Sequence, residues 1–195
     1  MFSKPIYTFL ILLVLVTVVT IADHHKQPQN VIAAAIPTPI KVIVINPPCF
    51  NPLELPLNAT GEFKAYMGWD AIKDKVTLQW FLQQFCWTDE HGFRRFNNKY
   101  VIAVGTGFAT HVGQELKITL STGVVFYAIV GDIKKDIHTD FTNRFVPCNG
   151  NIIEFLIDKK VMKQAVLDKG TISELSDMVG KVIKIEILDE REENK

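Results

Sequence analysis

Two carboxylates in this 195-residue chain have surroundings that favour acid–base chemistry. Asp132 follows an apolar strand that ends at Ile129 and Val130, so we expect its carboxyl group at a strand end, partly removed from water. Glu154 lies between Ile153 and Phe155, where a charge is costly unless it is paired or functional. Burial raises the pKa of a carboxyl group, and a second carboxylate nearby raises one of the pair further. Either residue is therefore a candidate general acid near neutral pH.

Both acidic residues also have a purely structural interpretation, and the sequence leaves it open. Asp132 could be a turn residue that caps the following loop. Glu154 could face solvent on an edge strand, because the alternation of its strand permits that orientation. A shared concave groove lined by aromatic residues would favour a catalytic pair, whereas acids on opposite faces would favour a binding protein.

A dense polar segment follows Asp132, and loops at strand ends often carry functional groups. His138 and Asp140 could supply two metal ligands, but two ligands do not make a site. A turn pinned by its own hydrogen bonds is the favoured interpretation, so we predict no metal ion and no cofactor. We expect His138→Ala to cost about 1 kcal/mol, the size of a lost hydrogen bond, and Arg144 to pair with a nearby acid. The residues assigned to loop shaping or substrate binding are Asp136, His138, Asp140 and Arg144.

The N-terminus carries an apolar run from Phe9 to Ala22 behind Lys4, with no charged residue inside it. The run is shorter than the roughly 20 residues of a transmembrane helix, and it is typical of a signal peptide or a short signal anchor. Lys4 favours an N-terminus inside the cell. We expect a retained anchor that makes the chain a single-pass cell-membrane protein with its domain outside the cytoplasm. A cleaved signal would make the domain secreted, and a buried core helix is the remaining alternative.

The overall charge gives no sign of a nucleic-acid partner. Lysine and arginine number 21, and aspartate and glutamate also number 21, so no basic excess exists to neutralise phosphates. The cysteines, Cys49, Cys86 and Cys148, show no C-x-x-C spacing, which leaves zinc and thioredoxin motifs without support. A Cys86–Cys148 bridge is one option, but geometry decides it.

Composition divides the chain into four parts. Seven of the nine prolines lie between Pro28 and Pro56, which favours an extended linker. An edge strand packed on the domain is the alternative there, and Ile40–Ile45 could form a strand. The expected parts are a signal segment (1–22), a proline-rich linker (23–60), a globular domain (61–190) and a charged tail (191–195).

The globular part is expected to be mainly β. Leu78, Phe81, Leu82 and Phe85 have helical spacing and predict a helix that packs through this face. Trp80 and Trp87 could line a sugar groove, although burial is the simpler role. Short strands punctuated by glycine favour a small barrel. The expected strands are 100–104, 115–120, 124–130, 151–157 and 182–188, with a short helical stretch at 161–167.

The order of these motifs resembles that of double-psi β-barrel domains, in the RlpA-like and three-aspartate branch that includes the barrel of MltA-type lytic transglycosylases. Residues 63–182 also resemble a group of exported or phage-associated proteins of Firmicutes. The family's Asp-Thr-Gly-Gly loop is replaced here by Asp132-Ile-Lys-Lys-Asp136, and its second aspartate by Glu154. The matching motifs are Tyr100–Gly105, Val112-Gly113, Ile118–Gly123, Val130-Gly-Asp132 and Ile152–Phe155.

This resemblance implies a six-stranded double-psi β-barrel with an N-terminal helical or irregular extension. It also implies a cell-envelope protein that acts on peptidoglycan glycan, with lytic transglycosylation as the chemistry if the protein is an enzyme. Asp132 or Glu154 would then be the catalytic acid. The alternative function is a non-catalytic module that binds the envelope or serves a phage-associated interaction.

Overall fold

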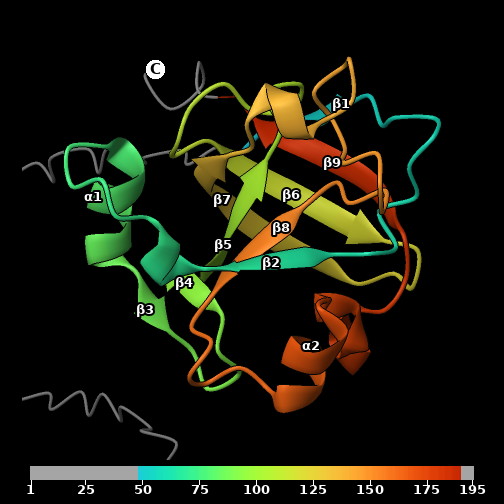
Figure 1. Cartoon of the computed structure of the whole chain (residues 1–195). Coiled ribbons are helices and arrows are strands. Elements are labelled where there is room, and N and C mark those ends of the chain that lie inside the picture. Colours follow the sequence, from blue (N-terminus) through green and yellow to red (C-terminus); the bar gives the residue numbers. More distant parts are fainter. Residues whose placement is uncertain (1–47, 190–195) are drawn as a thin grey trace, which may run out of the picture. The chain divides into compact units, whose positions relative to one another are not determined.

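A computed structural model describes residues 48–189 of the protein (Figure 1). The predicted signal segment, the possible strand at Ile40–Ile45 and the charged tail lie outside the described residues. Within residues 48–189, no helix has both the length and the apolar character needed to cross a membrane.

The described chain is built from short strands with little helix, as predicted. The strands are β1 (Phe50–Leu53), β2 (Ala65–Gly68), β3 (Trp87–Thr88), β4 (Arg94–Phe96), β5 (Lys99–Val104), β6 (Glu115–Leu120), β7 (Val125–Ile133), β8 (Glu154–Ile157) and β9 (Val182–Leu188). The helices are α1 (Leu78–Phe85) and α2 (Gln164–Lys169), with 3-10 turns η1 (Trp69–Ala71), η2 (Asp136–His138), η3 (Ile172–Glu174) and η4 (Ser176–Met178). Figure 1 shows α1 and α2 at separate sides of the sheet.

The mainly β prediction is confirmed, but the strand pairings do not form a closed six-stranded barrel. The nine strands belong to one mixed sheet with the order β1-β9-β6-β7-β5-β4-β3, in which β8 joins β2 to β5. One edge of β5 is shared, because β4 pairs with Lys99 and Tyr100 while β8 pairs with Ile102 and Ala103. The sheet therefore forks at β5, and its main path stays open at β1 and β3.

The domain begins before residue 61, inside the stretch predicted as a linker. Residues Phe50–Leu53 form β1, which pairs antiparallel with β9. Pro52 lies opposite Glu186 in this ladder, and proline fits an edge strand because the missing N–H faces away from the partner. The edge-strand alternative therefore describes residues 50–53 correctly.

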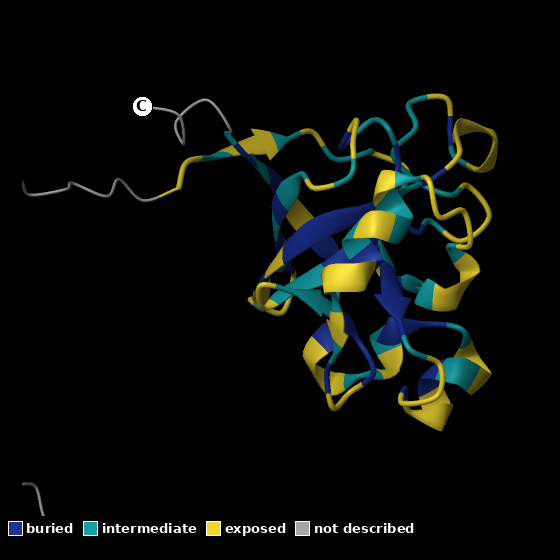
Figure 2. Cartoon of the chain, turned by 90° about the vertical axis from the view of Figure 1, so that its left-hand side faces the viewer, coloured by how far each residue is buried: buried dark blue, intermediate teal, exposed yellow. Residues whose placement is uncertain are grey.

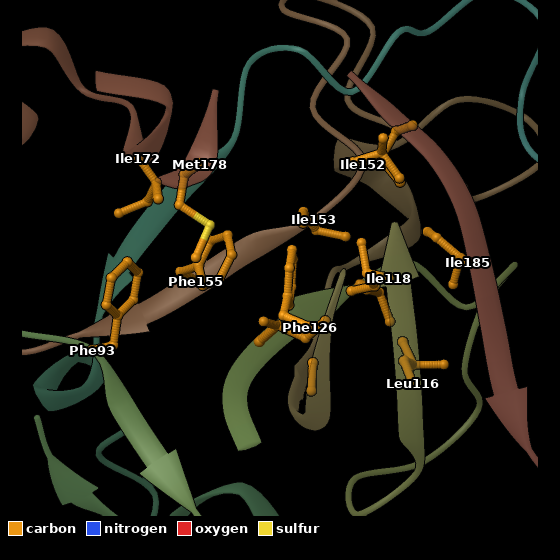
Figure 3. Close-up of a cluster of buried hydrophobic side chains, with 14 of the residues drawn as sticks. Phe93, Leu116, Ile118, Phe126, Ile152, Ile153, Phe155, Ile172, Met178 and Ile185 are labelled. Carbon is orange, nitrogen blue, oxygen red and sulfur yellow. The ribbon is translucent and has the colours of Figure 1, made fainter. Parts of the chain in front are cut away.

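The main hydrophobic core lies on one face of the central strands and is rich in aromatic rings (Figure 3). Phe155 of β8 is fully buried, with its ring centroid 5.2 Å from that of Phe93 and 5.8 Å from that of Phe126. Leu116 and Ile118 of β6 alternate with half-buried residues and point into the same core. This alternation was visible in the sequence, and it fixes which face of each strand looks inward.

A second, smaller apolar cluster covers the opposite face of the central strands. It contains Val101 and Ala103 of β5, Ile129 of β7 and Leu156 of β8, and Leu82 of α1 packs against it. Helix α1 thus covers the face of the sheet that looks away from the main core. This second face is the one on which the candidate site is found.

The predicted helix at 78–85 is confirmed, but its packing face is not. Thr77 caps the helix, because its side chain accepts a hydrogen bond from the Trp80 amide. Leu78, Phe81 and Phe85 are 65%, 57% and 61% exposed. Figure 2, in which the left-hand side of Figure 1 faces the viewer, shows exposed stretches in yellow along the helical ribbon nearest the viewer. The helical spacing was predicted correctly. Within residues 48–189, however, Leu78, Phe81 and Phe85 are exposed and are not buried in a core as predicted.

A β-bulge in β7 turns the chain just before Asp132. Ile102 of β5 pairs with Val130, but the next residue, Ala103, pairs with Asp132, so Gly131 is skipped in the ladder. A bulge of this kind redirects the side chains that follow it. Val130 points into the main core, and without the bulge Asp132 would have the same orientation because strand side chains alternate with a period of two. The bulge places Asp132 on the face of Ala103 instead.

We expect Gly131→Ala to destabilise the domain by about 1–3 kcal/mol, the usual cost of overpacking. A Cβ atom at this position would lie 2.2 Å from Cγ1 of the buried Val101. Urea unfolding measures the loss.

Val101→Ala provides the matched control for this prediction. It is destabilising by itself as a large-to-small change, but it removes the methyl group that the new Cβ would meet. The double variant should therefore lose less stability than the two single variants together. Additive losses would contradict the steric explanation.

Candidate functional site

Asp132 and Glu154 lie in one row across four neighbouring strands. Ala103 of β5 pairs with Asp132 on one side and with Glu154 on the other, and Glu154 pairs in turn with Ala65 of β2. Paired residues of adjacent strands point to the same face, with the strands about 4.8 Å apart. The two acids are therefore separated by roughly 10 Å at the backbone, which is two strand spacings. The small Ala103 between them leaves the space open.

These residues line one cavity of about 720 Å³, a size that suits a small ligand. The helix α1 contributes Gln79, the segment after β7 contributes Lys134, Lys135 and His138, and the segment before β8 contributes two asparagines. All of the lining residues are Ala65, Gln79, Ala103, Asp132, Ile133, Lys134, Lys135, His138, Val146, Asn149, Asn151 and Glu154. Both predicted catalytic carboxylates thus share a single concave site.

Burial raises the pKa of Asp132 above its ordinary value. Three contacts act in the other direction: the Ile133 amide donates to Oδ1 at 2.9 Å, Gln79 donates from its side chain, and Lys135 supplies a positive charge. The net direction is upward because removal from water disfavours the charged carboxylate. Asp132 accordingly holds its proton to a higher pH than a carboxyl group in water.

Glu154 has a different environment, because a buried lysine lies beside it. Lys134 Nζ is 3.8 Å from Glu154 Oε2, and the Lys134 side chain is only 5% exposed. Burial lowers the pKa of Lys134 to about 8, and the negative charge of Glu154 acts against that decrease. The opposite charge of Glu154 favours the ionised form of Lys134. The cavity therefore holds two carboxyl groups in unlike surroundings, one without a close cation and one beside a cation.

Asp140 organises the polar loop instead of taking part in the cavity wall. Its Oδ1 accepts hydrogen bonds from the amides of Arg144 at 2.8 Å and Phe145 at 3.0 Å, and its Oδ2 accepts from the Thr142 amide and hydroxyl. Burial acts to raise the pKa of Asp140, but the hydrogen bonds from Thr142, Phe145 and Arg144 outweigh it and hold the pKa at about 2. The predicted turn pinned by its own hydrogen bonds is present at this residue.

We expect Asp140→Ala to destabilise the domain by about 1–3 kcal/mol at neutral pH, because it leaves three partly buried backbone amides without their acceptor. The pKa of Asp140 in the folded protein is below its ordinary value of 3.8. The carboxylate therefore stabilises the fold above about pH 4, and this contribution is lost as the pH falls toward 2. Urea unfolding at pH 7 and pH 2.5 measures both effects, and the difference between variant and wild type should shrink at the lower pH.

Asp136→Ala is the matched control for Asp140→Ala. Asp136 is exposed and accepts a hydrogen bond from Thr106 Oγ1 at 2.9 Å, so its loss should change stability by no more than about 0.5 kcal/mol. Equal losses from the two variants would contradict the assigned role of Asp140.

Two expectations for the loop are not supported. The His138 side chain is exposed at the cavity, and among residues 48–189 it has no hydrogen-bond or ion-pair partner, which removes the reason for a stability loss on His138→Ala. Arg144 does not pair with a loop acid: its Nη1 lies 3.3 Å from Oε2 of Glu54, just after β1. The loop therefore contacts the N-terminal edge of the domain, a long-range contact that the local sequence could not indicate.

The remaining candidates do not add to the cavity. No aromatic residue is among the described residues that line it, because Trp80 of α1 and Trp87 of β3 both lie outside the cavity. Cys49, Cys86 and Cys148 are all free thiols, and burial raises the pKa of Cys86 to about 11. Residues 48–189 contain no group of three or more His, Cys, Asp or Glu that could hold a metal ion.

Three residues of the site were missed in the sequence. Lys134 is two positions after Asp132, and an extended chain places such residues on one side, so the spacing was an available signal. Ala103 could have been noticed as the small residue within an apolar strand. Gln79 had no local signal, because it reaches the site only through the docking of α1.

Comparisons of the chain with protein-family models, curated proteins and solved structures gave no match.

Proposed function

We propose that the protein acts on a glycan of the cell envelope, with Asp132 as the general acid and base. The observation that supports this most is the shared cavity, in which Asp132 has a raised pKa and Glu154 lies beside Lys134. A carboxyl group whose pKa is raised by burial, with a second carboxyl group in the same cavity, is a usual arrangement for acid–base catalysis on a glycosidic bond. Cavity size and polar lining are consistent with a sugar ligand.

The proposed reaction is a lytic transglycosylation. Asp132 donates its proton to the glycosidic oxygen as the bond to the anomeric carbon breaks. The resulting Asp132 carboxylate then takes the proton of the C6 hydroxyl, whose oxygen attacks the same anomeric carbon and closes a 1,6-anhydro ring. The proton is returned, so the reaction consumes no water. The negative charge of Glu154 would stabilise the positive charge that develops on the sugar ring.

The proposal extends to the relationship and the location of the chain. The motif order remains similar to that of double-psi β-barrels, and we propose that the open sheet is a variant of that architecture. We also propose that the segment before residue 23 anchors the chain in the cell membrane and places the domain outside the cytoplasm.

A non-catalytic binding module is the second candidate. Two observations favour it: the described cavity lining has no aromatic residue for sugar stacking, and α1 presents Phe81 and Phe85 to solvent, as a protein-binding surface does. In this alternative the cavity would hold an envelope ligand without cleaving it.

Incubation of the domain with purified peptidoglycan sacculi tests the proposal. We expect soluble 1,6-anhydro muropeptides, identified by mass spectrometry. Sedimentation of the protein with sacculi without any release would support the binding module instead. If the domain neither releases products nor sediments with the sacculi, both candidates are contradicted.

A further inference from the structure

The strongest feature that the proposed reaction leaves unused is the Lys134 ammonium. Its Nζ is buried and makes no hydrogen bond to any residue of the described chain. Glu154 Oε2, at 3.8 Å, is beyond hydrogen-bond distance. A buried charged donor without an acceptor carries a large desolvation cost, so a partner that supplies an acceptor would bind there favourably.

The cavity also carries an excess of positive charge. In the state that the proposed reaction requires, in which Asp132 carries its proton, Lys134 and Lys135 supply two positive charges against the single negative charge of Glu154, and His138 can add only a further positive one. One anionic group on a ligand would bring the cavity to neutrality. Asn149 and Asn151 stand in the same wall, and amides can bind the uncharged hydroxyl and acetamido groups of a sugar.

We infer that Lys134 forms a subsite for a carboxylate carried by the glycan, so that the protein selects an acidic sugar over a neutral one. This inference rests on the proposed function and names its substrate class. Burial lowers the pKa of Lys134 to about 8 and outweighs the opposing effect of Glu154. A bound carboxylate would raise that pKa again, because an opposite charge favours the protonated form.

Calorimetry with two forms of one ligand tests the subsite. The ligand is a tetrasaccharide of alternating N-acetylglucosamine and N-acetylmuramic acid, free of peptide, and its counterpart has each carboxyl group reduced to an alcohol. Binding is measured in the Asp132→Asn background, so that neither ligand is cleaved. We expect the carboxylate form to bind about 10- to 100-fold more tightly, the value of a charged hydrogen bond.

Variants of the two charged neighbours separate the subsite from general charge attraction. Lys134→Met should reduce the preference for the carboxylate form to less than about 3-fold, whereas Lys135→Met should keep most of it, because Lys135 is exposed and screened. Glu154→Gln should tighten binding of the carboxylate form alone, since it removes the competing negative charge. At pH 8, binding of the carboxylate form should raise the pKa of Lys134, so that binding takes up protons from the buffer. Calorimetry detects this uptake because the measured heat of binding then differs between buffers.

Each outcome decides between the two proposals. Tight binding of both forms without a preference would overturn the acidic-sugar inference while leaving the glycan function intact. A preference that survives Lys134→Met would overturn the assignment to Lys134. A carboxylate preference in a wild-type protein that cleaves nothing would support the inference and contradict the proposed reaction. Failure to bind either form would overturn the inference together with the glycan ligand.

Discussion

Asp132→Asn is expected to reduce the rate of anhydro-muropeptide release by about 10²- to 10⁴-fold, the usual contribution of general acid–base catalysis. Asparagine keeps the shape of the side chain and can still accept the hydrogen bond from the Ile133 amide. It cannot donate a proton to the glycosidic oxygen and take one back from the C6 hydroxyl. The rate is measured by chromatography of soluble products from sacculi.

The same variant should be more stable than the wild type at neutral pH. The pKa of Asp132 in the folded protein is raised, so folding favours its protonated form. Stability is therefore lost as the pH rises from the ordinary value of 3.8 through the raised pKa. Asparagine has no such transition, and its melting temperature should exceed that of the wild type above this range and match it at low pH. Loss of activity together with loss of stability would instead indicate a structural role.

Ala103→Leu is the second change for which we expect a large effect, a loss of glycan cleavage of at least about 10²-fold. Ala103 is the residue between Asp132 and Glu154 in the row across the strands, and it lines the cavity floor. A leucine there would occupy the space in which the sugar must lie between the two carboxyl groups, and misplacement of a substrate by about 1 Å already costs about 10²-fold. Product release from sacculi measures the loss.

Ala103→Ser is the matched control, because it adds a single oxygen atom and should retain most of the activity. Thermal unfolding of both variants separates blockage of the cavity from damage to the fold. Ala103 is 1% exposed and also contacts the second apolar cluster, so a moderate stability loss of about 1–3 kcal/mol is expected for leucine. Full activity in a folded Ala103→Leu protein would contradict the location of the glycan between the two acids.

The strands that alternate most clearly were the easiest part of the fold to predict. The segment at 115–120 has the boundaries expected from its sequence, because every second residue is buried in the core. The segment at 182–188 also has the expected boundaries, although burial along it does not alternate strictly. The start of the domain was harder to place. The proline-rich composition of residues 28–56, which include Phe50–Leu53, indicates a linker when it is considered locally, and only the pairing with β9 reveals an edge strand.

The two acidic residues of the candidate site were predicted from the sequence, but their arrangement in space was not. Alternation along β7 would direct Asp132 into the main core with Val130, and only the bulge at Gly131 reverses this orientation. The row through Ala103 depends on pairings between β5, β7 and β8, which are distant in sequence. Such pairings are set by the packing of the whole sheet, so a local motif can name the residues without placing them.

A titration of the Asp132 carboxyl carbon by NMR tests most directly whether the cavity makes this residue an acid. Aspartate labelled with ¹³C in the carboxyl group would be followed from pH 2 to pH 9, and the signal missing from Asp132→Asn would identify the residue. We expect a midpoint clearly above the ordinary value of 3.8, because burial outweighs the contacts from Ile133, Gln79 and Lys135. A midpoint at or below 3.8 would contradict it, since Asp132 would then be ionised throughout the physiological range and could not donate the proton.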